Sequence, residues 1–178
     1  MCIRDRGFEQ CIIAAGSAPV QLPFLPDDPR IMDSTGALAL TAAPGSMLVL
    51  GGGIIGLEMA AVYSALGTRI SVVEMLPGLL AGADPDIVRP LQKRIGRRYE
   101  NILLNTRVSA VEARPEGLRV TFEGSNAPDK PMSFDRILVA AGRAPNGGML
   151  ACERAGVCLL YTSPSPRDAT LSRMPSSA

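Results

Sequence analysis

Histidine is absent from this chain of 178 residues, and cysteine is scarce. Histidine is the side chain most often used as a general acid or base near neutral pH, so chemistry that needs it must come from outside the chain. The four cysteines, Cys2, Cys11, Cys152 and Cys158, show neither C-x-x-C nor paired metal-ligand spacing. A zinc site would also lack its usual nitrogen ligands. We expect Cys11, which falls in an apolar run, to be a small core residue.

An excess of charge of one sign and a long apolar run are also missing. The 18 basic and 17 acidic residues leave a net charge of +1, which does not favour a nucleic-acid or anionic-membrane partner. No run approaches the roughly eighteen apolar residues of a membrane span, and the N-terminus lacks the apolar core of a secretory signal. The 47% hydrophobic content favours a folded domain, and the expected location is cytoplasmic.

A glycine-rich turn is the most informative motif that is present. Gly51, Gly52, Gly53, Ile54, Ile55 and Gly56 follow an apolar run at residues 47–50 and precede a helical stretch. In a dinucleotide-binding turn, the first glycine makes the sharp turn and the second lets the backbone approach a pyrophosphate. The third, Gly56, lets the helix pack closely on its strand. The unpaired N–H groups at the start of the helix favour an anion.

An acidic residue completes this pattern. Residues 69–74 form a second predicted buried strand, which ends at Glu74, eighteen positions after Gly56. An acidic side chain there accepts hydrogen bonds from a ribose diol and repels a 2′-phosphate, so NAD is favoured over NADP. The alternative is a glycine-rich strand-to-helix turn with no ligand and with Glu74 merely on the surface.

The remaining patterns predict an α/β fold. Residues 11–15 suit a buried strand, residues 19–29 contain four prolines and suit a connecting segment, and Ser34 could cap a short helix over 35–40. A helix over 55–66 ends at Gly67. Its packing face is expected to include residues at three- and four-residue spacing: Leu57, Ala60, Ala61, Ser64 and Ala65.

A second helix is predicted over residues 84–99. Ile87, Val88, Leu91 and Ile95 share its apolar face. The opposite face is basic, and it favours a solvated surface over a phosphate-binding one because the net charge is balanced. The basic residues are Arg89, Lys93, Arg94, Arg97 and Arg98.

In the second half of the chain, the spacing of apolar residues changes from a helical to a strand-like pattern. Short alternating or apolar runs at 102–104, 108–113, 118–122 and 132–134 predict a small antiparallel meander. Residues 135–142 then form a continuous apolar strand that returns to the parallel sheet. The expected order is β-α-β-α-β, then the meander, then a final strand.

These stretches resemble the flavin-dependent pyridine nucleotide-disulfide oxidoreductases, and within that family the bacterial dihydrolipoamide dehydrogenases. The resemblance runs from Phe8 to Val157. It is carried by CIIAAGS at 11–17, DPRIMDS at 28–34, GGGIIGLEM at 51–59, VVEM at 72–75 and ILVAAGRAPN at 137–146.

The resemblance implies a role for particular residues. The NAD pyrophosphate and ribose contacts match Gly51, Gly52, Gly53, Ile54, Ile55 and Glu74. Val108 matches a position at the adenine end, and the loop beside the nicotinamide half matches Ala140, Ala141, Gly142 and Arg143. The loop that approaches FAD matches Ala15, Gly16 and Ser17. Glu58 matches an acidic residue near the nicotinamide that pairs with a flavin-side lysine, although an exposed helical glutamate is the alternative.

The resemblance also implies a Rossmann-like NAD-binding domain inserted into a split FAD domain. We expect a non-native-looking leader at 1–6, the end of the first FAD segment and a linker at 7–28, and the NAD domain at 29–146. The start of the second FAD segment follows at 147–157, and a non-native-looking disordered tail at 158–178. The tail is rich in serine and proline.

The family's redox-active C-x-x-x-x-C disulfide and its His–Glu pair have no counterpart in this sequence. We therefore expect an internal, inactive fragment of an enzyme that moves hydride between NAD and FAD and oxidises dihydrolipoamide. The parent is expected to be a homodimer serving 2-oxo acid dehydrogenase complexes. Two alternatives stay open: a related mercuric or NADH-peroxide reductase, and a stand-alone NAD-binding module without catalysis.

Overall fold

The computed structural model describes residues 7–157. The predictions for the leader and the tail, and those for Cys2 and Cys158, lie outside these residues. The chain forms two compact units. The larger contains residues 19–143, and the described part of the smaller contains residues 7–18 and 144–157.

A five-stranded parallel sheet forms the centre of the larger unit, in the order β2-β9-β3-β4-β5. The central strand β3 is buried along its whole length, as expected of a parallel sheet that is covered on both faces. The strands are β2 (Ile31–Met32), β3 (Ser46–Leu50), β4 (Arg69–Val73), β5 (Asn101–Leu103) and β9 (Arg136–Val139).

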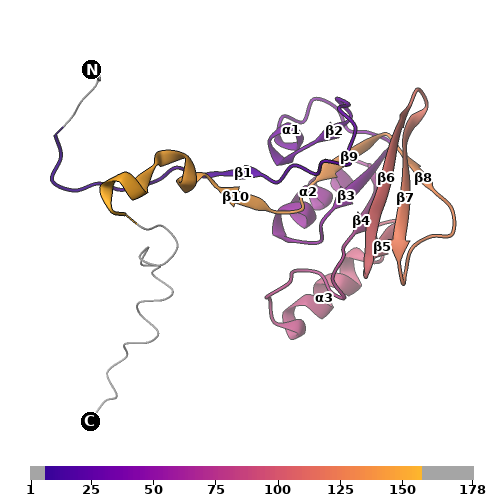
Figure 1. Ribbon diagram of the computed structural model, residues 1–178. Coiled ribbons are helices and arrows are strands. Elements are labelled where there is room, and N and C mark those ends of the chain that lie inside the picture. Colours follow the sequence, from indigo (N-terminus) through magenta and orange to yellow (C-terminus); the bar gives the residue numbers. More distant parts are fainter. Residues whose placement is uncertain (1–6, 158–178) are drawn as a thin grey trace, which may run out of the picture. The chain divides into compact units, whose positions relative to one another are not determined.

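The two faces of the sheet are covered by different layers (Figure 1). Successive side chains of a strand point to opposite faces. Met47 and Val49 of β3 pack with the helices, whereas Leu48 and Leu50 pack with the meander. The helices are α1 (Ser34–Leu38), α2 (Ile54–Ala65) and α3 (Pro85–Ile95). The antiparallel meander contains β6 (Thr106–Arg114), β7 (Gly117–Gly124) and β8 (Met132–Phe134).

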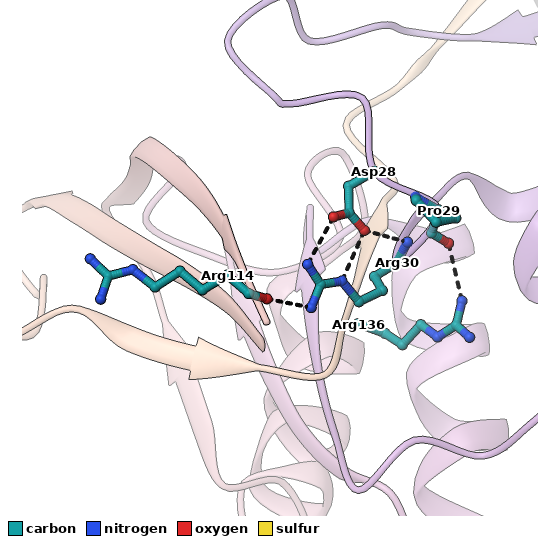
Figure 2. A network of polar contacts seen from close by, with 5 residues as sticks. All are labelled: Asp28, Pro29, Arg30, Arg114 and Arg136. Atoms are coloured by element: carbon teal, nitrogen blue, oxygen red, sulfur yellow. Dashed lines mark hydrogen bonds and ion pairs between the residues drawn. The ribbon is translucent and has the colours of Figure 1, made fainter. Parts of the chain in front are cut away.

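A polar network joins the segment before β2 to both β6 and β9 (Figure 2). Arg30 donates from Nε and Nη2 to the two carboxylate oxygens of Asp28, at 2.9 and 2.8 Å. Its Nη1 donates to the Arg114 carbonyl at 2.7 Å, where β6 ends. Arg136, at the start of β9, donates to the Pro29 carbonyl at 3.1 Å. Residues 28–30 are therefore fixed against the sheet and the meander together.

The remaining elements are short. They are the strands β1 (Ser17–Pro19) and β10 (Arg143–Pro145), which form a two-stranded sheet, and the 3₁₀ helices η1 (Asn146–Leu150) and η2 (Cys152–Ala155). Among residues 7–157, no helix has the length and apolar character needed to cross a membrane.

The prediction of a buried strand at residues 11–15 is wrong. The first strand is β1, which starts at Ser17. Ile12 is 92% exposed, and Cys11 is exposed rather than part of the core. An apolar run forms a strand only when a neighbour pairs with it, and no described strand pairs with these residues.

One further strand prediction needs correction, and one strand was missed. The prediction that residues 102–104 belong to the meander is wrong, because β5 is parallel to β4 and extends the main sheet. The two-residue strand β2 was not predicted, because its pairing with β9 supplies the order that so short a segment lacks alone.

Helix boundaries and faces differ in detail from the prediction. Asp33, not Ser34, caps α1, because its carboxylate accepts the Gly36 N–H at 2.8 Å. The second predicted helix ends at Ile95 rather than at residue 99, and Ile87 is 71% exposed.

On α2 the packing face was predicted from small residues, and it is partly wrong. Ala61 and Ala65 are exposed, whereas Tyr63 is buried. The Tyr63 hydroxyl donates to the Ala37 carbonyl at 2.8 Å, which ties α2 to α1.

Candidate functional site

The turn from β3 into α2 requires glycine at its two ends. Gly51 has φ +110°, and a Cβ there would collide with the carbonyl oxygen of Ala140. A Cβ on Gly56 would collide with the carbonyl oxygen of Gly51 and lie 3.1 Å from Val49. The turn is therefore closed by backbone contacts that a larger residue would prevent.

Gly53 faces open space at the start of α2. It is the N-cap residue, it has no side-chain cap, and a Cβ there would meet nothing within 4 Å. The first N–H of the helix to bond within it belongs to Leu57, which donates to the Gly53 carbonyl. The preceding amides and the positive end of the helix dipole are thus directed at space where an anion can bind.

Glu74 lies beside this turn, directly after β4. One carboxylate oxygen accepts the Gly52 N–H at 2.7 Å, and the other accepts the Leu76 N–H at 2.8 Å. The side chain is half-buried. A carboxylate can accept about four hydrogen bonds, so Glu74 can hold the turn and still accept from hydroxyl groups of a ligand.

A cavity of about 190 Å³ lies at the start of α2. It brings together two groups of predicted residues: Gly53, Ile54 and Ile55 from the turn, and Ala140, Gly142 and Arg143 from the chain after β9. Pro19, Ser34 and Val139 complete its lining.

Ser34 is a cavity residue that the sequence did not predict. Arg143 donates from Nη1 to the Ser34 hydroxyl at 3.4 Å. The sequence pattern predicts only a helix-capping role for Ser34. Its position depends on β2 lying beside β9, and no local pattern contains that information.

Other predicted residues lie outside the cavity lining. Glu58 is exposed, one turn into α2, and Ala141 is exposed beside Ala140. Val108 is half-buried on β6 and packs against the core under the meander. It lies two residues after Thr106, whose N–H donates to the Glu74 carbonyl at 3.0 Å.

Ala15, Gly16 and Ser17 belong to the smaller unit. Asn146 donates from its backbone N–H to the Gly16 carbonyl at 2.9 Å and from its side chain to the Ala15 carbonyl at 3.1 Å. Gly16 has φ +70°. Asn146 thus holds the carbonyls of Ala15 and Gly16 through both its side chain and its backbone.

Within residues 7–157, no group of three or more cysteine, aspartate or glutamate side chains is placed to hold a metal ion. The five basic residues predicted on the outer face of the second helix are all exposed.

Comparison with known proteins gives several similar chains. Dihydrolipoyl dehydrogenase of Vibrio cholerae serotype O1 is 52% identical over 151 residues, which is 84% of this chain and 32% of the relative. The Haemophilus influenzae enzyme of that name is 48% identical over 151 residues, which is 84% of this chain and 31% of the relative. This chain therefore spans about a third of the length of these relatives.

Solved structures agree with this relationship. The HOCl-induced flavoprotein disulfide reductase RclA of Escherichia coli matches with a TM-score of 0.70 and 28% identity, over 82% of this chain and 33% of that one. LpdA of Mycobacterium tuberculosis matches with a TM-score of 0.69 and 27% identity, over 82% of this chain and 31% of that one. A family model described as pyridine nucleotide-disulphide oxidoreductase matches residues 4–161. This chain belongs to the pyridine nucleotide-disulphide oxidoreductase family.

Proposed function

We propose that the chain carries the NAD-binding domain of a flavoenzyme of the dihydrolipoyl dehydrogenase type. The observation that supports this most is the position of Glu74 at the end of β4, against the glycine turn that ends β3. Adjacent parallel strands that end in a glycine turn and an acidic residue are the arrangement that binds a dinucleotide. A relative that is 52% identical carries the name dihydrolipoyl dehydrogenase.

The residues of the site fit NAD. The pyrophosphate would lie on the first-turn amides of α2, where Gly53 leaves open space. The ribose hydroxyls would donate to Glu74. Residues 140–143, of which all but Ala141 line the cavity, would border the nicotinamide half. Val108 would lie toward the adenine end. NAD is favoured over NADP because residues 74–77 contain no basic side chain and the carboxylate repels a 2′-phosphate.

We assign residues 29–146 to the NAD domain and the flanking segments 7–28 and 147–157 to a split FAD domain. Ala15, Gly16 and Ser17 would then approach FAD in the parent enzyme. Glu58 would be an auxiliary residue near the nicotinamide, since it is exposed on the first turns of α2.

The proposed parent is a homodimeric dihydrolipoyl dehydrogenase that serves 2-oxo acid dehydrogenase complexes. In such an enzyme the cofactors supply the hydride and electron chemistry, and the protein supplies binding and orientation. The chain itself would bind nucleotide without catalysing the reaction. It contains no histidine to act as an acid or base, and its cysteines lack the spacing of the redox disulfide.

A fluorescence titration of the full chain tests this function. We expect saturable enhancement of nicotinamide fluorescence with NADH and clearly weaker binding of NADPH. Competition by ADP should displace NADH. The same chain unfolded in urea is the control. A folded chain that does not bind NADH, or that prefers NADPH, would contradict the proposal.

A further inference from the structure

The loop between β4 and α3 contacts the glycine turn at Gly52. A Cβ atom on Gly52 would lie only 2.5 Å from Cδ2 of Leu79, so this side chain packs directly against the Gly52 backbone. Leu79 is 3% exposed. The next residue, Leu80, donates its N–H to the Gly52 carbonyl at 2.9 Å. Gly52 is therefore packed by one leucine and hydrogen-bonded by the other.

Leu80 adopts an unfavourable backbone conformation to make this hydrogen bond. Its φ is +52°, in the left-handed region that leucine rarely occupies. The Leu80 carbonyl accepts the Ala83 N–H at 2.9 Å, which closes the turn just before Asp84 caps α3. Strained residues of this kind persist when their surroundings hold them, and they cluster where geometry matters for binding.

The hydrogen bond to the Gly52 carbonyl has a consequence for Gly53. Both groups belong to one planar trans peptide, in which C=O and N–H point in opposite directions. When Leu80 holds the Gly52 carbonyl on the loop side, the Gly53 N–H is directed away from the loop. The Gly52 N–H is held separately by Glu74. The orientation of the Gly53 amide is therefore fixed before any ligand binds.

We propose that Leu79 and Leu80 are positioning residues for the nucleotide site, and that they orient the Gly53 N–H toward the pyrophosphate. The inference rests on the proposed NAD function and adds residues that touch no cofactor. Preorganised donors lose little conformational freedom on binding, so holding this peptide in place favours phosphate recognition in particular.

The test compares ADP with adenosine as competitors of NADH on the full chain. The dissociation constant of adenosine divided by that of ADP measures the contribution of the phosphates, since adenosine has none. In Leu79→Ala we expect this ratio to fall about tenfold, the equivalent of one well-placed hydrogen bond. Ile95→Ala, a similar truncation of a buried residue on α3, is the matched control, and its ratio should equal that of the unsubstituted chain.

Leu79→Val gives a milder version of the test should Leu79→Ala fail to fold. The expected fall is about threefold, because valine lacks the Cδ2 atom that reaches Gly52 but keeps most of the side-chain volume. Leu79→Met should restore the ratio. Equal weakening of ADP and adenosine by the Leu79 variants would overturn the positioning role while leaving the NAD function intact. An unsubstituted chain that binds neither NADH nor ADP would overturn both.

Discussion

Arg30 and Asp28 form a two-pronged ion pair in which each carboxylate oxygen accepts from the guanidinium (Figure 2). The backbone N–H of Arg30 donates to the same carboxylate at 2.8 Å. The Asp28 side chain is 12% exposed, so the pair is better shielded from water than an ordinary surface pair. Because Arg30 also reaches the end of β6, the pair joins the entry to the sheet with the meander.

The first prediction concerns acid stability. The hydrogen bonds from the Arg30 side chain and backbone lower the pKa of Asp28 from its ordinary 3.8 to about 2. A carboxylate whose pKa is lowered by folding stabilises the native state above its unfolded pKa, and this contribution is lost as the pH falls through the folded value. Asp28→Asn should therefore lower stability at pH 7, and its difference from the unsubstituted chain should shrink between about pH 4 and pH 2.

Urea unfolding at a series of pH values measures this difference. Asp86→Asn is the control, because the Asp86–Arg89 pair has side chains 80% and 74% exposed and surface pairs contribute little. A constant effect of Asp28→Asn from pH 7 to pH 2 would show that the ionised carboxylate is not what stabilises the fold.

The second prediction concerns Glu74. Glu74→Ala should weaken NADH binding and reduce discrimination against NADPH, because both the ribose acceptor and the repelling charge are removed. It also frees the Gly52 N–H. The measurement is a pair of fluorescence titrations with NADH and NADPH. Glu123→Ala, which removes an exposed partner of Arg107 on the meander, should change neither the affinity for NADH nor the discrimination against NADPH. Unaltered selectivity in Glu74→Ala would refute the assignment.

The centre of the site could be predicted because its signals are local. The glycine spacing, the two apolar runs and the acidic residue all lie within residues 47–74, and β3, α2 and β4 form there as expected. By contrast, the short strands β2 and β5 depend on a neighbouring strand for their place in the sheet. Three apolar residues such as 102–104 look alike in a meander and at the edge of a parallel sheet.

The parts of the site that were missed are non-local. Ser34 lines the cavity because β2 lies beside β9, and Leu79 supports Gly52 because the loop after β4 folds back. Neither contact follows from periodicity or spacing. Tyr63 shows the same limit on α2. The pattern of small residues suggested where the helix packs, but a hydrogen bond to α1 decides that the tyrosine is buried.

The third prediction compares two glycines of the turn. Gly56→Ala should destabilise the fold by about 3 kcal/mol, because the added Cβ meets backbone that cannot move aside. Gly53→Ala should cost no more than about 1 kcal/mol, the usual penalty for alanine at an N-cap, since its Cβ meets open space.

The affinity for NADH should also distinguish the Gly53→Ala and Gly56→Ala variants. The Cβ of Gly53→Ala enters the space assigned to the pyrophosphate, so this variant should fold yet bind NADH more weakly. Thermal unfolding and NADH titration of both variants measure the two effects. A stable Gly56→Ala, or a Gly53→Ala with unchanged affinity, would contradict the assigned geometry of the turn.

The last prediction uses two tyrosines that differ in one hydrogen bond. The Tyr63 hydroxyl is buried and donates to the Ala37 carbonyl, so Tyr63→Phe removes one donor from that carbonyl, which keeps the Leu40 N–H at 3.3 Å. The expected loss of stability is about 1 kcal/mol. Tyr99 is almost as buried, at 7% exposure, and burial raises its pKa. Its hydroxyl has no hydrogen-bond partner among residues 7–157, so Tyr99→Phe should change the free energy of unfolding little. Urea unfolding of the two variants at pH 7 measures the difference, and equal losses in both would mean that the link between α1 and α2 does not stabilise the fold.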